Sequence, residues 1–180
     1  MTVAIDSETA ACLRTLRGAR LLRVLAERYP NPPSYHRVQL HTERSVITVT
    51  LRSESVSENL EVCCISARPG EVTSAFDERD EIRPADFRID QVLVLRRAEW
   101  LEPGEPSSVG IGKNPQQHII GVPDDVRPWF EHTLVDAGLA LVDERGSGLS
   151  LEADTFPLVL QCRYTVSSSA LPRGDAWPIE

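Results

Sequence analysis

The stretch that decides the fold is residues 35–53, which read YHRVQLHTERSVITVTLRS. Its apolar positions are Val38 and Leu40 in the first half and Ile47, Val49 and Leu51 in the second. Apolar residues at every second position are typical of half-buried strands, because successive side chains of an extended chain point to opposite faces. The polar connection at residues 43–44 is short enough to join the two runs. We therefore predict an antiparallel hairpin here.

Similar runs on both sides extend the predicted sheet. Residues 59–67 alternate in the same way and complete an antiparallel meander with the first two strands. Residues 91–97 are apolar on both faces, as in a strand that is covered on both sides. Residues 139–143 and 149–153 flank a turn-rich linker, and residues 158–166 alternate most regularly of all. These runs predict a mainly antiparallel sheet of about six to seven strands.

Two segments show helical rather than strand periodicity. Between residues 7 and 28 apolar side chains recur every three or four positions, and a proline-rich stretch then ends the pattern. A second helix is predicted near residues 125–137, with Gly138 placed as a left-handed C-cap. The combination predicts an α+β fold. We expect one globular domain over residues 1–166 and an extended or mobile tail over residues 167–180.

Composition and charge narrow the class of protein. The 180 residues are 41% hydrophobic and 26% charged, which is typical of a folded chain. The formal charge of −8 and the pI near 5.1 disfavour nucleic-acid binding, since phosphate contacts need a basic surface. The sequence shows neither a secretion signal nor an apolar run that could span a membrane, so we expect four reduced cysteines and a cytoplasmic location. Lys113 is the only lysine, a bias typical of a GC-rich genome, and we predict a bacterial source.

Two long polar stretches, residues 68–90 and 102–123, hold most of the candidate binding residues. The first contains an acidic run at residues 77–81, which suits a basic partner. The second contains Lys113 in a glycine-rich string, but this string lacks the first glycine and the hydroxyl residue of a phosphate-binding P-loop. On the second predicted helix, His132 lies one turn from an aspartate and could pair with it. The candidate binding residues are Asp77, Glu78, Asp80, Glu81, Lys113, His118, Trp129 and His132.

No catalytic or metal-binding motif is present in the sequence, and we predict no cofactor. The first hypothesis is a non-enzymatic protein-interaction module, of the immunity or inhibitor type, that binds another protein through its acidic and Gly/Pro-rich loops. The alternative is a small enzyme or ligand-binding protein whose site is assembled from dispersed histidines and carboxylates. A third hypothesis is a structural component that pairs through exposed strand edges, and homo-oligomer formation stays open.

Overall fold

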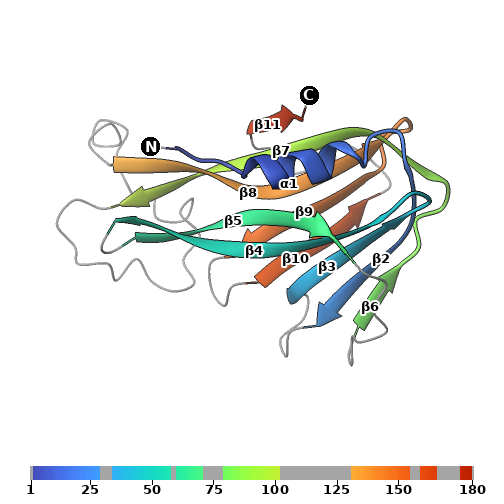
Figure 1. Cartoon of the computed structure of the whole chain (residues 1–180), viewed down its shortest axis with the longest axis horizontal. Coiled ribbons are helices and arrows are strands. Elements are labelled where there is room, and N and C mark those ends of the chain that lie inside the picture. Colours follow the sequence, from blue (N-terminus) through green and yellow to red (C-terminus); the bar gives the residue numbers. More distant parts are fainter. Residues whose placement is uncertain are drawn as a thin grey trace.

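A computed structural model describes residues 2–28, 34–57, 60–70, 79–101, 131–154, 159–165 and 175–179. Within these ranges the protein is nearly all β, with eleven strands and one short helix (Figure 1). The elements in chain order are β1 (Thr2–Val3), α1 (Ser7–Arg14), β2 (Arg20–Arg28), β3 (Ser34–Thr42), β4 (Val46–Ser57), β5 (Leu60–Pro69), β6 (Arg79–Ile82), β7 (Phe87–Leu101), β8 (Glu131–Asp143), β9 (Gly148–Asp154), β10 (Val159–Thr165) and β11 (Asp175–Pro178). The predicted α+β class is therefore wrong.

The N-terminal helix has 8 residues, against the 22 that the prediction over residues 7–28 implied. Helix α1 ends at Arg14, and the chain turns at Gly18, whose φ of +72° is a left-handed conformation that favours glycine. The following strand, β2, contains a register shift between Leu21 and Arg23 that displaces Leu22 from the regular pairing with β3. This bulge sets the buried residues Leu21 and Val24 three positions apart, a spacing that imitates helical periodicity.

The predicted second helix is also wrong where the structure describes it. Residues 131–137 belong to strand β8, and residues 124–130 lie outside the described ranges. Gly138 does not cap a helix but lies inside the strand, where a Cβ atom would come within 2.9 Å of the Leu151 carbonyl oxygen. Because Gly138 has no side chain, the backbones of β8 and β9 can approach each other closely at this point. Part of the polar stretch 68–90 also forms strand, because β6 and the start of β7 lie within it.

Six strands close into a barrel. The order is β3, β10, β9, β8, β7, β2 and back to β3, and each neighbouring pair is antiparallel. The closing contacts are short, since β2 meets β7 at Arg20 and Leu21, and β10 meets β3 at Leu160 and Gln161. Side chains fill the interior. The main apolar core joins barrel residues to residues of α1, β4 and β5, and its largest fully buried members are Phe87, Leu13, Leu16, Leu21, Leu40, Ile47, Ile65, Ile89, Leu139, Leu141 and Leu149.

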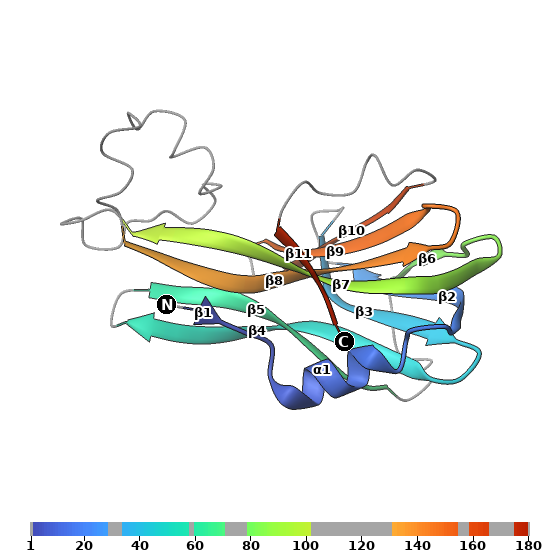
Figure 2. The ribbon, with the colours of Figure 1, turned by 90° about the horizontal axis from the view of Figure 1, so that it is seen from above.

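The predicted antiparallel meander of β3, β4 and β5 is confirmed, and it extends the barrel sideways. Strand β4 pairs with β3 only along residues 46–49, and its hairpin partner β5 lies against β8 (Figure 2). A second apolar cluster forms at this contact. Its buried members are Val62, Cys63, Cys64, Val135, Ala137 and Ala153. Helix α1 packs against β5 and sends Leu13 into the main core.

Candidate functional site

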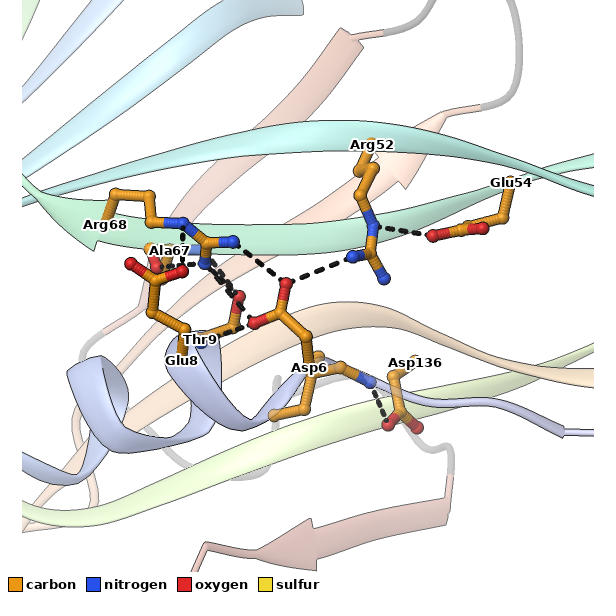
Figure 3. Close-up of polar contacts among 9 residues, drawn as sticks. Asp6, Glu8, Thr9, Arg52, Glu54, Ala67, Arg68 and Asp136 are labelled. Atoms are coloured by element: carbon orange, nitrogen blue, oxygen red, sulfur yellow. Dashed lines mark hydrogen bonds and ion pairs between the residues drawn. The ribbon is translucent and has the colours of Figure 1, made fainter.

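The most connected polar cluster lies where the first residues of the chain meet β4, β5 and β8. Asp6 precedes α1 in an extended conformation, and its Oδ1 accepts a hydrogen bond of 2.6 Å from the amide of Thr9. This is the geometry of an N-cap, in which a short polar side chain satisfies an amide of the first helical turn. The cap fixes the Asp6 carboxylate at the start of the helix, on the side that faces the β4–β5 hairpin (Figure 3).

Two arginines of that hairpin bind the Asp6 carboxylate. Arg68 donates to both oxygens, at 2.9 Å to Oδ2 and 3.3 Å to Oδ1, and Arg52 donates to Oδ2 at 3.0 Å (Figure 3). The hydrogen bond from Arg68, followed by the amide of Thr9, holds the pKa of Asp6 well below its usual range. The carboxylate therefore stays charged and bridges the helix to two strands.

Both arginines are fixed by additional partners. The Arg52 guanidinium lies 2.9 Å from Glu54, and the Arg68 guanidinium donates to the carbonyl oxygen of Ala67 at 2.9 Å and to the Thr9 hydroxyl at 2.7 Å. The Ala67 amide in turn donates to the same hydroxyl at 3.3 Å. Helix α1 thus covers the outer edge of β5 at this point with side-chain hydrogen bonds instead of a strand.

A buried carboxylate on β8 completes the cluster. Asp136 is only 3% exposed; its Oδ2 accepts a 3.0 Å hydrogen bond from the amide of Ile5, and its Oδ1 accepts one of 2.7 Å from Arg96. Beside it, β1 pairs with β8 in parallel through two residue pairs, Thr2 with Leu134 and Val3 with Val135. We call residues 2–6 the strap, because they connect β8 to the β4–β5 hairpin.

A second polar network lies on the opposite face of β3 from the barrel core. His41 is 5% exposed; its Nε2 lies 3.2 Å from the Gln39 side-chain oxygen and its Nδ1 lies 3.5 Å from Arg23. Because an arginine can only donate, this arrangement suits a neutral histidine with its proton on Nε2. Burial and then the charge of Arg23 lower the pKa of His41.

A shallow polar hollow of about 200 Å³ lies at the barrel end near the β8–β9 turn. Three of its charged groups, Asp86, Asp143 and Arg145, already have partners within the chain. Arg145 donates to Asp86 at 2.8 Å, and Asp143 accepts the amides of Arg145 and Ser147 at 2.9 and 2.6 Å. The hollow is completed by Arg88 and Glu144. Its contacts stabilise the turn, and we assign no ligand to it.

Of the eight residues that the sequence suggested as a site, the structure describes three: Asp80, Glu81 and His132. Asp80 lies on β6 and accepts hydrogen bonds from Arg28 at 2.9 Å and from the Tyr35 hydroxyl at 3.1 Å. The bond from Arg28 lowers the pKa of Asp80, whereas burial and then Asp80 raise the pKa of Tyr35 to about 12. Glu81 is next to it on the same strand and pairs with Arg83.

The third described candidate lies on a different strand. His132 lies on β8, opposite Trp100 of β7, so the helical pairing predicted for it with Asp136 is wrong. Asp77, Glu78, Lys113, His118 and Trp129 lie outside the described residues. Of the cluster around Asp6, sequence reasoning singled out no member as a site. The one available signal was an aspartate directly before a helix start.

Comparison of the chain with protein-family models, with curated proteins and with solved structures finds no match. Any functional conclusion therefore depends on geometry and charge. Among the described residues, no three histidine, cysteine or carboxylate side chains converge in a way that could hold a metal ion. In the same part of the chain, no helix has the length and apolar character needed to cross a bilayer.

Proposed function

We propose that this protein is a non-enzymatic module that binds another protein through its acidic connecting segments. The observation that supports this proposal is the uneven distribution of charge. Of 27 acidic and 19 basic residues in the chain, 18 and 16 lie in the described ranges, which leaves 9 acidic and 3 basic residues outside them. The described framework therefore carries a formal charge of −2 out of −8.

Arginines neutralise many carboxylates within the framework. Carboxylates in ion pairs with arginine include Asp6, Glu27, Glu54, Asp80, Asp86 and Asp136. The excess lies in two segments of the sequence. Residues 71–78 contain three acidic and no basic residues, and residues 102–130 contain four acidic and two basic residues. A concentrated negative charge accelerates encounter with a basic protein by long-range attraction, as in inhibitor and immunity proteins.

The two segments join the framework at different places. Residues 71–78 follow the end of β5, and residues 102–130 follow the end of β7, and these two strands run in opposite directions (Figure 1). Strand β7 alone has 15 residues, which corresponds to roughly 45 Å at about 3.3 Å per residue. We therefore treat the segments as two separate candidates for the contact, each with its own variant.

The test compares neutralised variants with a matched control. One variant carries Glu71→Gln, Asp77→Asn and Glu78→Gln, and a second neutralises the four acidic residues of 102–130. The control neutralises three exposed acidic residues of the framework, Glu61, Asp90 and Glu144. A stoichiometric partner is isolated from the producing cells at low salt, and its association rate is measured by interferometry at increasing salt.

We expect one neutralised variant to associate at least about 10-fold more slowly and to lose most of its salt dependence. The control changes the net charge by the same amount as the first variant and is expected to stay within about 3-fold of the wild type. Equal rates for all four proteins would contradict the proposal, as would the absence of any stoichiometric partner at low salt.

No disulfide joins the four cysteines, which supports a cytoplasmic location for this encounter.

A further inference from the structure

A line of polar side chains crosses the outer face of three neighbouring strands, β2, β3 and β4. Arg23 of β2 lies 3.5 Å from Nδ1 of His41 on β3, and Nε2 of His41 lies 3.2 Å from the side-chain oxygen of Gln39 on the same strand. The side-chain amide of Gln39 donates to the Thr48 hydroxyl on β4 at 3.4 Å. His41 and Gln39 are 5% and 2% exposed, so these contacts belong to the packed part of the sheet.

These contacts require a neutral histidine ring. Because an arginine only donates, Nδ1 of His41 must accept, and the proton of the neutral ring is then on Nε2, which donates to Gln39. A second proton on the ring would go to Nδ1, where it would face the donor atoms of Arg23. It would also place two positive charges next to each other at a buried position. Protonation therefore preserves the contact with Gln39 and breaks the contact with Arg23.

The charged groups around His41 come from β2 and from β6, the strand beyond it. Burial and then the charge of Arg23 lower the pKa of His41, whereas Glu81 of β6 raises it. Glu81 pairs with Arg83 at 2.7 Å, and the contact from β4 is the uncharged Thr48. Since Arg23 is only half-buried, its guanidinium can turn toward solvent when the ring becomes charged. The least costly response to protonation is thus a movement of Arg23.

Strand β2 is paired least regularly at the position of Arg23. Its register with β3 shifts between Leu21 and Arg23. On the opposite edge, β7 pairs with β2 up to Leu21 and β6 pairs with it from Val24, so within the described chain residues 22–23 have no strand partner on that side. Segments with few main-chain partners open locally at a lower free energy than the core of a protein. The contact between Arg23 and His41 therefore holds the weakest point of β2.

We propose that the contact between Arg23 and His41 is a pH-sensitive switch that opens β2 locally. At neutral pH the unprotonated ring accepts from Arg23 and keeps residues 22–24 against β3. In acid the ring takes up a proton from solvent, the guanidinium moves outward, and β2 opens at the register shift while β7, β8 and β9 keep their pairing. The switch is independent of the acidic connecting segments and of the function proposed for them.

Native-state hydrogen exchange tests the switch on the unaltered protein at about pH 7.5 and about pH 5. After correction for intrinsic exchange rates, the slowest amide of residues 22–24 should lose protection at least about 5-fold more than Leu139 and Leu141 of the barrel do. Equal losses in both regions would show that acid acts through global unfolding. No loss in residues 22–24 would show that protonation leaves β2 closed. Either result overturns the proposal.

Three variants assign the effect to the two groups. His41→Gln should abolish the extra loss of protection, because glutamine does not titrate. The matched control His36→Gln removes an exposed histidine of the same strand and should retain the extra loss. Arg23→Gln should abolish it as well and should raise the midpoint of the His41 ring titration in NMR spectra, because the neighbouring positive charge is gone. An extra loss that persists in His41→Gln, or in Arg23→Gln if the histidine variant does not fold, overturns the proposal.

Discussion

Removing the carboxylate of Asp136 should destabilise the protein more than any other single change to a charged group of the strap cluster. The side chain of Asp136 is 4% exposed and that of its partner Arg96 is 24% exposed. Breaking a fully buried ion pair by deleting one partner costs about 3–5 kcal/mol. Partial exposure of Arg96 reduces this cost, whereas loss of the hydrogen bond from the Ile5 amide adds about 1 kcal/mol. We therefore expect Asp136→Ala to lower the free energy of unfolding by about 3 kcal/mol.

Two further variants separate charge from hydrogen bonding in this prediction. Asp136→Asn keeps an acceptor for the Ile5 amide and loses only the charge, so its expected cost is smaller, about 1–2 kcal/mol. Asp90→Ala removes an exposed carboxylate from the neighbouring strand β7 and should change stability by less than about 0.5 kcal/mol. Urea unfolding, followed by circular dichroism, measures all three free energies. In thermal unfolding the alanine variant should melt roughly 6–12 °C lower than the wild type.

The reasoning is refuted if Asp136→Ala costs less than about 1 kcal/mol while the midpoint and slope of the Asp90→Ala transition match those of the wild type. Such a result would mean that water reaches the carboxylate in solution and solvates Arg96 as well as Asp136 does.

Four other changes give distinct signatures. Asp6→Asn should cost about 1 kcal/mol near neutral pH, and this difference should shrink as the pH falls below about 4, because a carboxylate whose folded pKa is lowered contributes stability that is lost on protonation. The wild type should lose stability as the pH falls below about 6.5, because the buried His41, whose pKa is lowered, resists protonation in the folded state. His41→Gln should remove the part of this loss that comes from His41. Arg23 and Glu81 are the charged groups that act on its pKa. Gly138→Ala should destabilise by about 1–3 kcal/mol in urea unfolding, since the new Cβ atom would lie 2.9 Å from a backbone oxygen. Arg68→Lys should also lower the free energy of unfolding in the same assay, because an ammonium group cannot reproduce the planar contacts of the guanidinium.

The strands with clean alternation could be predicted from the sequence, and those with irregularities could not. Strands β3, β4 and β5 follow the period of two that residues 35–67 display, and their antiparallel pairing is as predicted. Strand β2 was predicted as helix because Ala19, Leu22 and Leu25 recur every three positions, although Leu22 is displaced by a bulge and is exposed. No local signal distinguishes a bulged strand from a short helix. The partner strands on both sides of β2 decide between them.

The first half of strand β8 was predicted as helix for a related reason, whereas its second half, residues 139–143, was predicted as strand. Its residues 133–143 are buried except for the partly buried Leu134, so both faces are covered over most of its length. A strand that is buried on both faces does not alternate, and Gly138 added a plausible helix end. Closure of the barrel also could not be predicted. It depends on short contacts between segments far apart in the chain, such as Tyr35 with Leu160.

The polar cluster around Asp6 could not be predicted from the sequence, because its members form no sequence motif. Their contacts give them a common role, which is to hold the strap. Asp6, Arg52, Arg68 and Asp136 come from the strap, β4, β5 and β8, and each bonds to at least two of its neighbours. A guanidinium suits such a position, since its fixed fork of donors serves a carboxylate and a carbonyl oxygen at the same time. The preference for arginine over lysine, which composition alone attributes to the genome, thus has a use at the strap. The same pairs also neutralise much of the framework, and residues 71–78 and 102–130 together carry −5 of the formal charge of −8.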